Sequence, residues 1–241
     1  MRFFFTLILL LTAHCALAWD LHDFGEEAAS PVTTDAKYFF WSGIALTTLV
    51  VLVDDPIVDP FQQETASDRP LGHSSQWGDW LGQLVPNALY IGYYGIKGWV
   101  DEDEEAHRRA IGMFKATAYS TGVTTVLKYT IREPRPNDHH TKNSFPSGHT
   151  TSAFAFSGYV MAEHEYYIGI PALILSTFVG YSRINDNMHW LQDVIAGATI
   201  GFSYGWGISR LQKKHKGEGP TTMVTPILDS QTAGLALYRE F

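Results

Sequence analysis

Residues 144–163, SFPSGHTTSAFAFSGYVMAE, carry the strongest indication of how this chain folds. Proline, the capping residue Ser147 and Gly148 precede a run of apolar and small residues, which predicts a helix over about 149–163. The free N–H groups at a helix N-terminus form an anion site, and a glycine lets a ligand approach the backbone closely. His149 would lie in the first turn, beside a bound anion. Taken alone, the motif fits a binding site and an ordinary surface histidine equally well.

A second motif lies downstream in residues 182–193, SRINDNMHWLQD. His189 and Asp193 are four positions apart, so on a helix they would share a face and touch. A carboxylate on one ring nitrogen fixes the tautomer and leaves the other nitrogen free as a nucleophile. Arg183 lies just ahead of this pair. Histidine–aspartate pairs are also common on helix surfaces, so this motif has a purely structural interpretation as well.

A third motif lies upstream in residues 128–136, KYTIREPRP. Lys128 is expected near the end of a helix over about 104–127. The two prolines that flank Arg135 exclude regular helix and hold that residue in extended backbone. A lysine and a planar guanidinium presented from a rigid turn can clamp phosphate oxygens, although cations at a helix end are more often a solvated cap.

The apolar segments predict an all-α fold, a helical bundle with a short C-terminal β-hairpin. Helical segments are expected at about 38–53, 84–99, 104–127, 149–163, 166–182 and 190–210. Residues 54–80 are rich in Asp, Pro, Gly, Ser and Gln and are predicted to form a long loop. The segments Thr221–Leu228 and Gly234–Phe241 are predicted to be two short strands.

Small residues and stray histidines in these segments carry further expectations. Gly197, Gly201 and Gly205 recur at a spacing of four, which predicts the close approach of a second helix in a membrane or a soluble protein alike. No partner pattern surrounds the other histidines, which are predicted to be surface residues: His139, His140 and His164 among them.

The first 18 residues, MRFFFTLILLLTAHCALA, predict a cleavable secretory signal peptide. Arg2 provides the positive start, an apolar run follows, and Ala16-Leu17-Ala18 has the small-residue pattern of a cleavage site. An uncleaved membrane anchor is the alternative. The only cysteine, Cys15, lies inside this segment, so the mature chain is expected to have no disulfide, no catalytic thiolate and no cysteine-bound metal.

The length and net charge of the remaining chain limit the number of domains and the class of ligand. Residues 19–241 are long enough for a single domain, with a core over about 38–210 and the hairpin over about 221–241. The net charge of −8 disfavours broad nucleic-acid binding. It leaves room for a local anion site, because exposed charges are screened beyond about 8–10 Å.

Together and in this order, the three motifs resemble the signature of the phosphatidic-acid-phosphatase type 2 and vanadium haloperoxidase superfamily, K-x6-RP, PSGH and SR-x5-H-x3-D. Every defining position is filled, from Lys128 with Arg135-Pro136, through Pro146–His149, to Ser182-Arg183, His189 and Asp193. One departure is that only nine residues separate Pro136 from Pro146, fewer than in many soluble acid phosphatases of this group. The loop over the site is therefore expected to be short.

The resemblance implies a helical bundle with a phosphate site among helix ends. Lys128, Arg135 and Arg183 would hold the phosphate oxygens, and Ser147 and the Gly148 N–H would add hydrogen bonds. No metal and no cofactor are expected, and vanadate would bind as a phosphate mimic. The expected substrate is a phosphorylated small molecule or lipid, with membrane association and without nucleic acid.

The resemblance also implies a catalytic group for each step. His189 would attack phosphorus and become phosphohistidine, and Asp193 would orient its ring. His149 would protonate the leaving oxygen and then activate water. With the signal peptide, this indicates an exported enzyme in the periplasm or at the periplasmic face of a membrane.

Four functions compete at this point. The first is a phosphatase of lipid phosphates or diphosphates, and the second a soluble periplasmic acid phosphatase acting on small phosphomonoesters. A vanadate-dependent haloperoxidase would use the same site, but this chain is short for that group. A non-catalytic protein that binds anionic lipid head groups is disfavoured because no catalytic position is degenerate.

Overall fold

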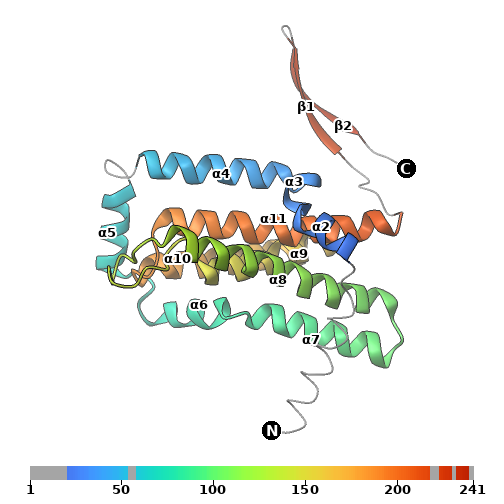
Figure 1. Cartoon of the computed structure of the whole chain (residues 1–241), viewed down its shortest axis with the longest axis horizontal. Coiled ribbons are helices and arrows are strands. Elements are labelled where there is room, and N and C mark those ends of the chain that lie inside the picture. The colour runs from blue at the N-terminus through green and yellow to red at the C-terminus, as the bar shows by residue number, and fades with distance from the viewer. Residues whose placement is uncertain (1–20, 54–57, 218–222, 230–231, 239–241) are drawn as a thin grey trace.

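The computed structural model describes residues 21–53, 58–217, 223–229 and 232–238, and these residues form a bundle of helices followed by two strands (Figure 1). The helices are α2 (Leu21–Ala28), α3 (Ser30–Thr33), α4 (Lys37–Leu52), α5 (Asp59–Asp68), η2 (Gly72–Ser74, 3-10), α6 (Ser75–Gly82), α7 (Val85–Val100), α8 (Glu104–Ile131), α9 (Gly148–Glu163), α10 (Tyr166–Asn185) and α11 (Leu191–His215). The predicted signal peptide over 1–18 lies outside the described residues. The all-α prediction is confirmed for the body of the chain.

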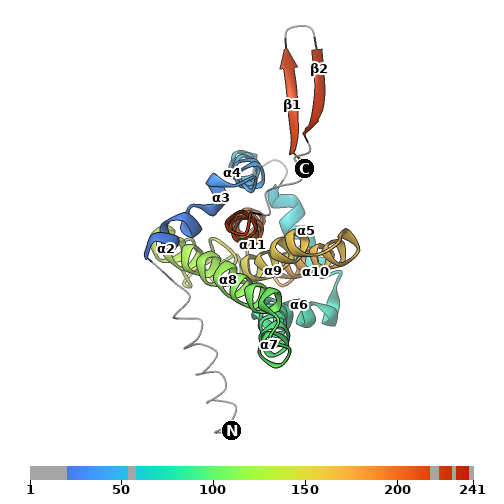
Figure 2. The same cartoon turned by 90° about the vertical axis from the view of Figure 1, so that its right-hand side faces the viewer.

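Helix α11 runs through the middle of the bundle. Seen end-on, it has α4 on one side and α8 and α9 on the other (Figure 2). Helix α10 packs against α9, α7 packs against α8, and α6 packs against α10. The ends of α8, α9, α10 and α11 carry the three sequence motifs, so this arrangement decides which motif residues meet.

The glycine stripe on α11 lets α9 approach it backbone to backbone, as the spacing predicted. A Cβ atom at Gly197 would lie 2.6 Å from the carbonyl oxygen of Ser147, and one at Gly201 would lie 2.2 Å from that of Thr151. At Gly205 the α9 backbone is equally close. No larger side chain fits at these positions without moving one helix, so the stripe sets the spacing of the two helices.

The core joins the faces of α8, α9 and α11. Met113, Tyr159 and Ile208 come from these three helices and are almost completely buried. Lys115 interrupts the apolar face of α8, yet it is buried and paired with Glu27 at 2.5 Å. Apolar burial of this kind stabilises a fold by about 25 cal/mol per Å².

The prediction of a long loop over 54–80 is wrong for residues 59–80, which contain α5, η2 and most of α6, while residues 54–57 lie outside the described residues. Asp59 and Pro60 are residue types common in loops, but an acid and a proline also favour the first turn of a helix. In α6 the glycines face other helices, and the two tryptophans, Trp77 and Trp80, are exposed. Packing against the bundle therefore overrides the loop-like composition.

The prediction for His164 is also wrong, whereas His139 and His140 are exposed as expected. His164 is half-buried at the end of α9, with Nε2 2.8 Å from the Tyr90 hydroxyl. Burial and the neighbouring Arg109 lower its pKa. Tyr90 lies on α7, far from His164 in the sequence, so local spacing contained no sign of this contact.

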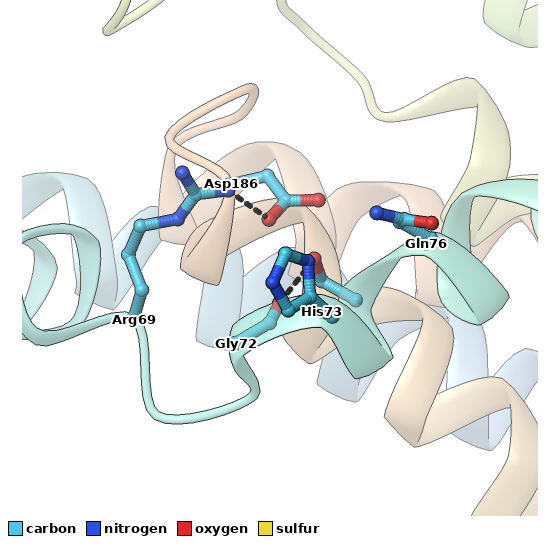
Figure 3. A pocket seen from close by; sticks show the side chains of 6 residues that line it. Arg69, Gly72, His73, Gln76 and Asp186 are labelled. Atoms are coloured by element: carbon cyan, nitrogen blue, oxygen red, sulfur yellow. Dashed lines mark hydrogen bonds and ion pairs between the residues drawn. The ribbon is translucent and has the colours of Figure 1, made fainter.

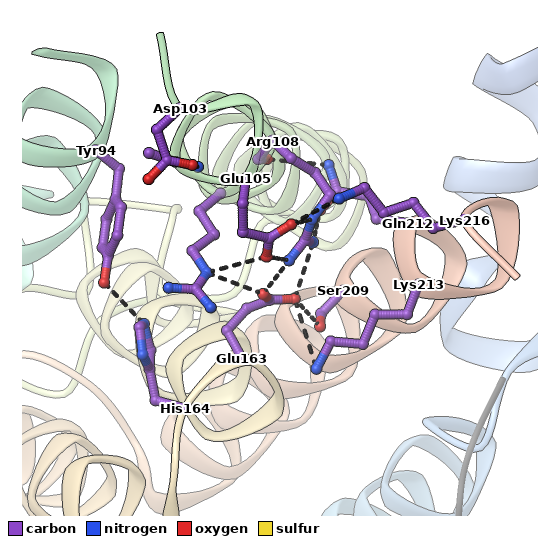
Figure 4. Close-up of polar contacts among 12 residues, drawn as sticks. Tyr94, Asp103, Glu105, Arg108, Glu163, His164, Ser209, Gln212, Lys213 and Lys216 are labelled. Carbon is purple, nitrogen blue, oxygen red and sulfur yellow. Dashed lines mark hydrogen bonds and ion pairs between the residues drawn. The ribbon is translucent and has the colours of Figure 1, made fainter. Parts of the chain in front are cut away.

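A buried ionic cluster lies beside His164, at the ends of α9 and α11 that are remote from the three motifs (Figure 4). The side chain of Glu163 is fully buried and pairs with Arg108 of α8. Ser209 of α11 donates a hydrogen bond to the same carboxylate. The cluster therefore ties three helices together at this end of the bundle.

The chain continues into β1 (Met223–Asp229) and β2 (Thr232–Tyr238). They pair antiparallel, with Met223 opposite Tyr238 and Asp229 opposite Thr232. These positions overlap both predicted strands.

Candidate active site

His189 lies in the turn between α10 and α11, just before the helix on which it was expected. Its Nδ1 is 3.3 Å from Oδ2 of Asp193. The same carboxylate oxygen caps α11 by accepting the Trp190 N–H at 2.9 Å. The predicted contact is present, but it results from a helix cap rather than from two side chains on one helical face.

Ser144 completes this group and was not singled out from the sequence. Its hydroxyl donates to Oδ2 of Asp193 at 2.5 Å and lies 3.4 Å from Nδ1 of His189. Gln62 of α5 donates to the backbone carbonyl of His189 at 3.1 Å. The ring of His189 is thus held from its Nδ1 side and through its backbone.

The electrostatics of the site keep the imidazole of His189 neutral. The residue is 2% exposed, and its burial lowers its pKa well below the ordinary value. The cations of Lys128, Arg135 and Arg183 lower it further, because they disfavour a second positive charge nearby. Burial raises the pKa of Asp193. A neutral imidazole held at Nδ1 has its Nε2 lone pair available as a nucleophile.

Helix α9 begins at Gly148, one residue before His149, as the motif predicted. Ser147 is the N-cap, and its hydroxyl accepts from the Thr150 N–H at 3.4 Å and from the Thr150 hydroxyl at 2.9 Å. A Cβ at Gly148 would lie 3.9 Å from Cε of Lys128. The lysine of the first motif therefore lies over the N-terminus of the helix that begins in the second motif.

Lys128 and Arg135 are both held by the segment that leads into α9. Lys128 Nζ donates to the backbone carbonyls of Asn143 and Ser144, at 2.5 and 3.0 Å. Arg135 Nε donates to the side-chain oxygen of Asn143 at 2.9 Å. Burial and the charge of Arg135 lower the pKa of Lys128 to about 8. The two cations are therefore oriented by one short segment while their charges repel each other.

Arg183, near the end of α10, is 2% exposed and is held by two carboxylates. Its Nη1 is 2.5 Å from Oδ1 of Asp79, and its Nη2 is 3.4 Å from Oδ2 of Asp186. Nη2 also donates to the backbone carbonyl of Ser75 at 3.4 Å. The guanidinium is thus fixed between α6 and the end of α10.

Asp79 of α6 was missed by sequence reasoning because its segment was predicted to be loop. The same Oδ1 atom that pairs with Arg183 lies 3.3 Å from Nε2 of His149. That nitrogen is buried and makes no hydrogen bond to any residue that the structure describes, because the close carboxylate is poorly aligned with it. Burial and Arg183 lower the pKa of His149 to about 4, whereas Asp79 acts to raise it.

Two glycines place α6 against the site. A Cβ at Gly78 would lie 2.2 Å from the Ser182 hydroxyl oxygen, and one at Gly82 would lie 2.6 Å from Cβ of His149. The helix can therefore lie directly on α10 and on the first turn of α9. Asp79, between these glycines, is carried into contact with residues of both helices.

The structure brings all eight predicted site residues into one region. His189 acts electrostatically on His149, and Arg135 and Arg183 act on both rings. The Ser147 N–H donates to the backbone carbonyl of Asp193 at 3.0 Å, which joins the second motif to the third. The complete set is His189, His149, Asp193, Lys128, Arg135, Ser147, Gly148 and Arg183.

A pocket of about 290 Å³ lies between the start of α6 and Asp186 (Figure 3). Arg69, Gly72, His73, Ser75, Gln76 and Asp186 line it. Arg69 pairs with Oδ1 of Asp186 at 3.1 Å, so the carboxylate that holds Arg183 also forms one wall of the pocket. Through Ser75 and Asp186, which both contact Arg183, the pocket adjoins the predicted phosphate site.

Comparison with known proteins finds several phosphatases that are similar to this chain. A lipid A 1-phosphatase of Porphyromonas gingivalis is 30% identical over 130 residues, covering 53% of this chain and 29% of that protein. Lipid phosphate phosphatase 2 of Arabidopsis thaliana is 24% identical over 236 residues, covering 76% and 80%. The crystal structure of Aquifex aeolicus LpxE aligns at 22% identity with a TM-score of 0.43, covering 71% of this chain and 94% of that one. This chain thus spans less than a third of the first of these relatives.

Residues 109–216 match the family description of the PAP2 superfamily, and this range holds all three motifs. Residues 109–216, which carry the candidate site, are therefore similar to the PAP2 superfamily.

Proposed function

We propose that this protein is a phosphatase that hydrolyses phosphomonoesters or diphosphates of lipids through a phosphohistidine on His189. The observation that carries the proposal is that a buried, neutral His189, held at Nδ1 by Asp193, lies within the field of three cations. Phosphoryl transfer depends on positioning and on stabilisation of charge on the equatorial oxygens. Lys128, Arg135, Arg183 and the α9 N-terminus supply that charge without a metal or another cofactor.

The reaction proceeds in two displacements. In the first, Nε2 of His189 forms a bond to phosphorus, the bond from phosphorus to the leaving oxygen breaks, and His149 donates a proton to that oxygen. In the second, His149 takes a proton from water, whose oxygen bonds to phosphorus while the phosphorus–nitrogen bond breaks. Inorganic phosphate leaves, and both histidines return to their starting states.

The low pKa of His149 suits the second displacement directly, because a neutral imidazole is ready to accept a proton. For the first displacement the ring must be protonated. A bound phosphate dianion and the carboxylate of Asp79 favour that state, since both oppose the positive field of Arg183. The protonation of His149 is therefore coupled to whether the site holds phosphate.

The molecular surface favours a lipid substrate over a small phosphomonoester. Large apolar side chains are exposed on several helices, including Leu52 of α4, Leu89 and Trp99 of α7 and Ile174 of α10. Among the described residues, α10 is long and apolar enough to cross a membrane, although 44% of that stretch is buried in the bundle. Exposed apolar surface of this extent supports contact with lipid or with another protein. With the predicted signal peptide, this supports action at the periplasmic face of a membrane.

The related lipid A 1-phosphatase and lipid phosphate phosphatase indicate which substrates to test first. The panel comprises lipid A, phosphatidate, prenyl diphosphate and p-nitrophenyl phosphate, each with the purified protein. We expect phosphate release from a lipid, and an acid-labile phosphoenzyme with radiolabelled substrate that is absent in His189→Ala. Near-normal turnover by His189→Ala would refute the mechanism. If protein extracted without detergent prefers p-nitrophenyl phosphate, the result would favour a soluble acid phosphatase instead. Oxidation of bromide in the presence of vanadate and peroxide would favour a haloperoxidase.

A further inference from the structure

Asp79 is a negative charge placed among the cations of a phosphate site. Its Oδ1 atom touches both Nη1 of Arg183 and Nε2 of His149, and no motif of the sequence includes it. Gly78 and Gly82 leave no side chain between α6 and its neighbours, so the backbone itself sets the position of Asp79. The packing of α6 therefore brings the half-exposed carboxylate of Asp79 within reach of both residues.

We propose that Asp79 is a positioning residue that competes with substrate phosphate for Arg183 and favours the proton on His149. The inference rests on the proposed phosphatase reaction and adds a residue to it. In the free protein, Asp79 occupies the Nη1 side of Arg183, where a phosphate oxygen would compete with it. When phosphate takes that position, the carboxylate remains beside His149, whose proton goes to the leaving oxygen.

The surroundings of His149 show why this carboxylate matters. The groups that act on the ring are Arg183 of α10, Arg135 of the α8–α9 connection, His189 before α11, and Asp79 of α6. Burial and the first three all disfavour the protonated ring, and Asp79 alone of these groups favours it. Without the Asp79 carboxylate, the proposed general acid His149 would lose the group that helps it to keep its proton.

Asp186 provides a matched control. It also pairs with Arg183, on Nη2 at 3.4 Å, but among the described residues no hydrogen bond or ion pair joins it to His149. Asp79→Asn and Asp186→Asn each remove one negative charge from the same guanidinium. Their effects on phosphate affinity should be similar in direction, whereas only the first should alter the proton chemistry.

The experiment combines a binding measurement with a pH profile. Calorimetry with inorganic phosphate and with vanadate reports affinity without turnover, and rapid-quench single-turnover kinetics report phosphoenzyme formation between pH 4 and 9. We expect Asp79→Asn to bind phosphate at least about fivefold more tightly than the wild-type protein. We also expect the fall of phosphoenzyme formation at high pH to move down by about one unit. Asp186→Asn should tighten phosphate binding and keep the wild-type pH profile.

Asp79→Ser serves as a second variant with the same expected shifts, and the side chain of Asp79 is 46% exposed, so neither change opens a core cavity. Unaltered phosphate affinity, or a pH profile that moves equally in Asp79→Asn and Asp186→Asn, overturns the role of Asp79. Failure of the wild-type protein to form a phosphoenzyme on His189 overturns the proposed reaction instead. The two failures are therefore distinguishable.

Discussion

The backbone N–H of Ser147 donates to the backbone carbonyl of Asp193 at 3.0 Å, so the turn before α9 is bonded directly to the first turn of α11. His149 and His189 lie just beyond the two ends of this link, at helix starts that are distant in the sequence. The glycine stripe of α11 continues the contact along both helices. The relative position of the two histidines therefore depends on the spacing between α9 and α11.

Gly201→Ala is expected to reduce both stability and activity by separating these helices. Its Cβ would lie 2.2 Å from the Thr151 carbonyl oxygen, and backbone atoms on both sides cannot yield without a helix shift. Overpacking of this kind costs about 1–3 kcal/mol in the free energy of unfolding. Denaturant unfolding and phosphate release measure the two effects.

Gly122→Ala is the control for that change. Gly122 lies on the exposed side of α8, and no neighbouring atom of the described chain lies within 4 Å of the position that a Cβ would take. Alanine should therefore stabilise the helix by roughly 0.5–1 kcal/mol. Equal effects of the two glycine substitutions would contradict a specific role for the α9–α11 contact.

Lys128 is expected to make phosphate binding sensitive to alkaline pH. Burial and Arg135 lower its pKa to about 8, so the free protein loses this positive charge as the pH rises through that value. The dissociation constant for phosphate should therefore increase above about pH 8. Calorimetric titrations on either side of that pH measure this change. Lys128→Arg keeps its charge throughout and should show a weaker dependence; identical curves for the two proteins would exclude Lys128 as the cause.

Asp193→Asn is expected to lower turnover far more than it lowers phosphate affinity. Oδ2 of Asp193 accepts from Ser144, from the Trp190 N–H and from Nδ1 of His189, and an amide nitrogen in its place would present a donor to a donor. A wrong tautomer of a catalytic histidine costs up to about 10⁴-fold in rate. Single-turnover rates and calorimetry with vanadate separate the two effects. Asp193→Asn with wild-type rates would show that the carboxylate does not set the tautomer.

Glu163→Leu is expected to destabilise the fold while leaving the chemistry of the site unchanged. The Glu163 carboxylate is fully buried with Arg108, and removal of one partner from a buried pair costs about 3–5 kcal/mol. Glu163 ends α9, whereas His149 lies in the first turn of the same 16-residue helix. We expect a lower unfolding midpoint and an unchanged pH profile at temperatures where the variant is folded. A shifted profile would indicate that the two ends of the bundle are coupled.

The eight motif residues were predictable because spacing within a motif reflects local backbone geometry. Ser144 and Asp79 were not predictable in this way, since their partners lie on segments that only tertiary packing brings near. Composition gave the wrong prediction for residues 59–80, because the residue types that are common in loops also occur at the starts of helices. The prediction for His164 failed because its partner, Tyr90, is 74 residues away in the chain, where no local pattern could reveal the contact.

The glycine contacts between α9 and α11 also bear on how this protein tolerates mutation. A side chain added at those positions meets backbone, so the two helices whose N-terminal ends lie beside His149 and His189 have little freedom to move apart. In contrast, the pocket near Arg183 is lined by Arg69, Gly72, His73 and Gln76, which are all exposed. Substrate range is therefore free to diverge at the rim while the reacting pair is inherited as a unit.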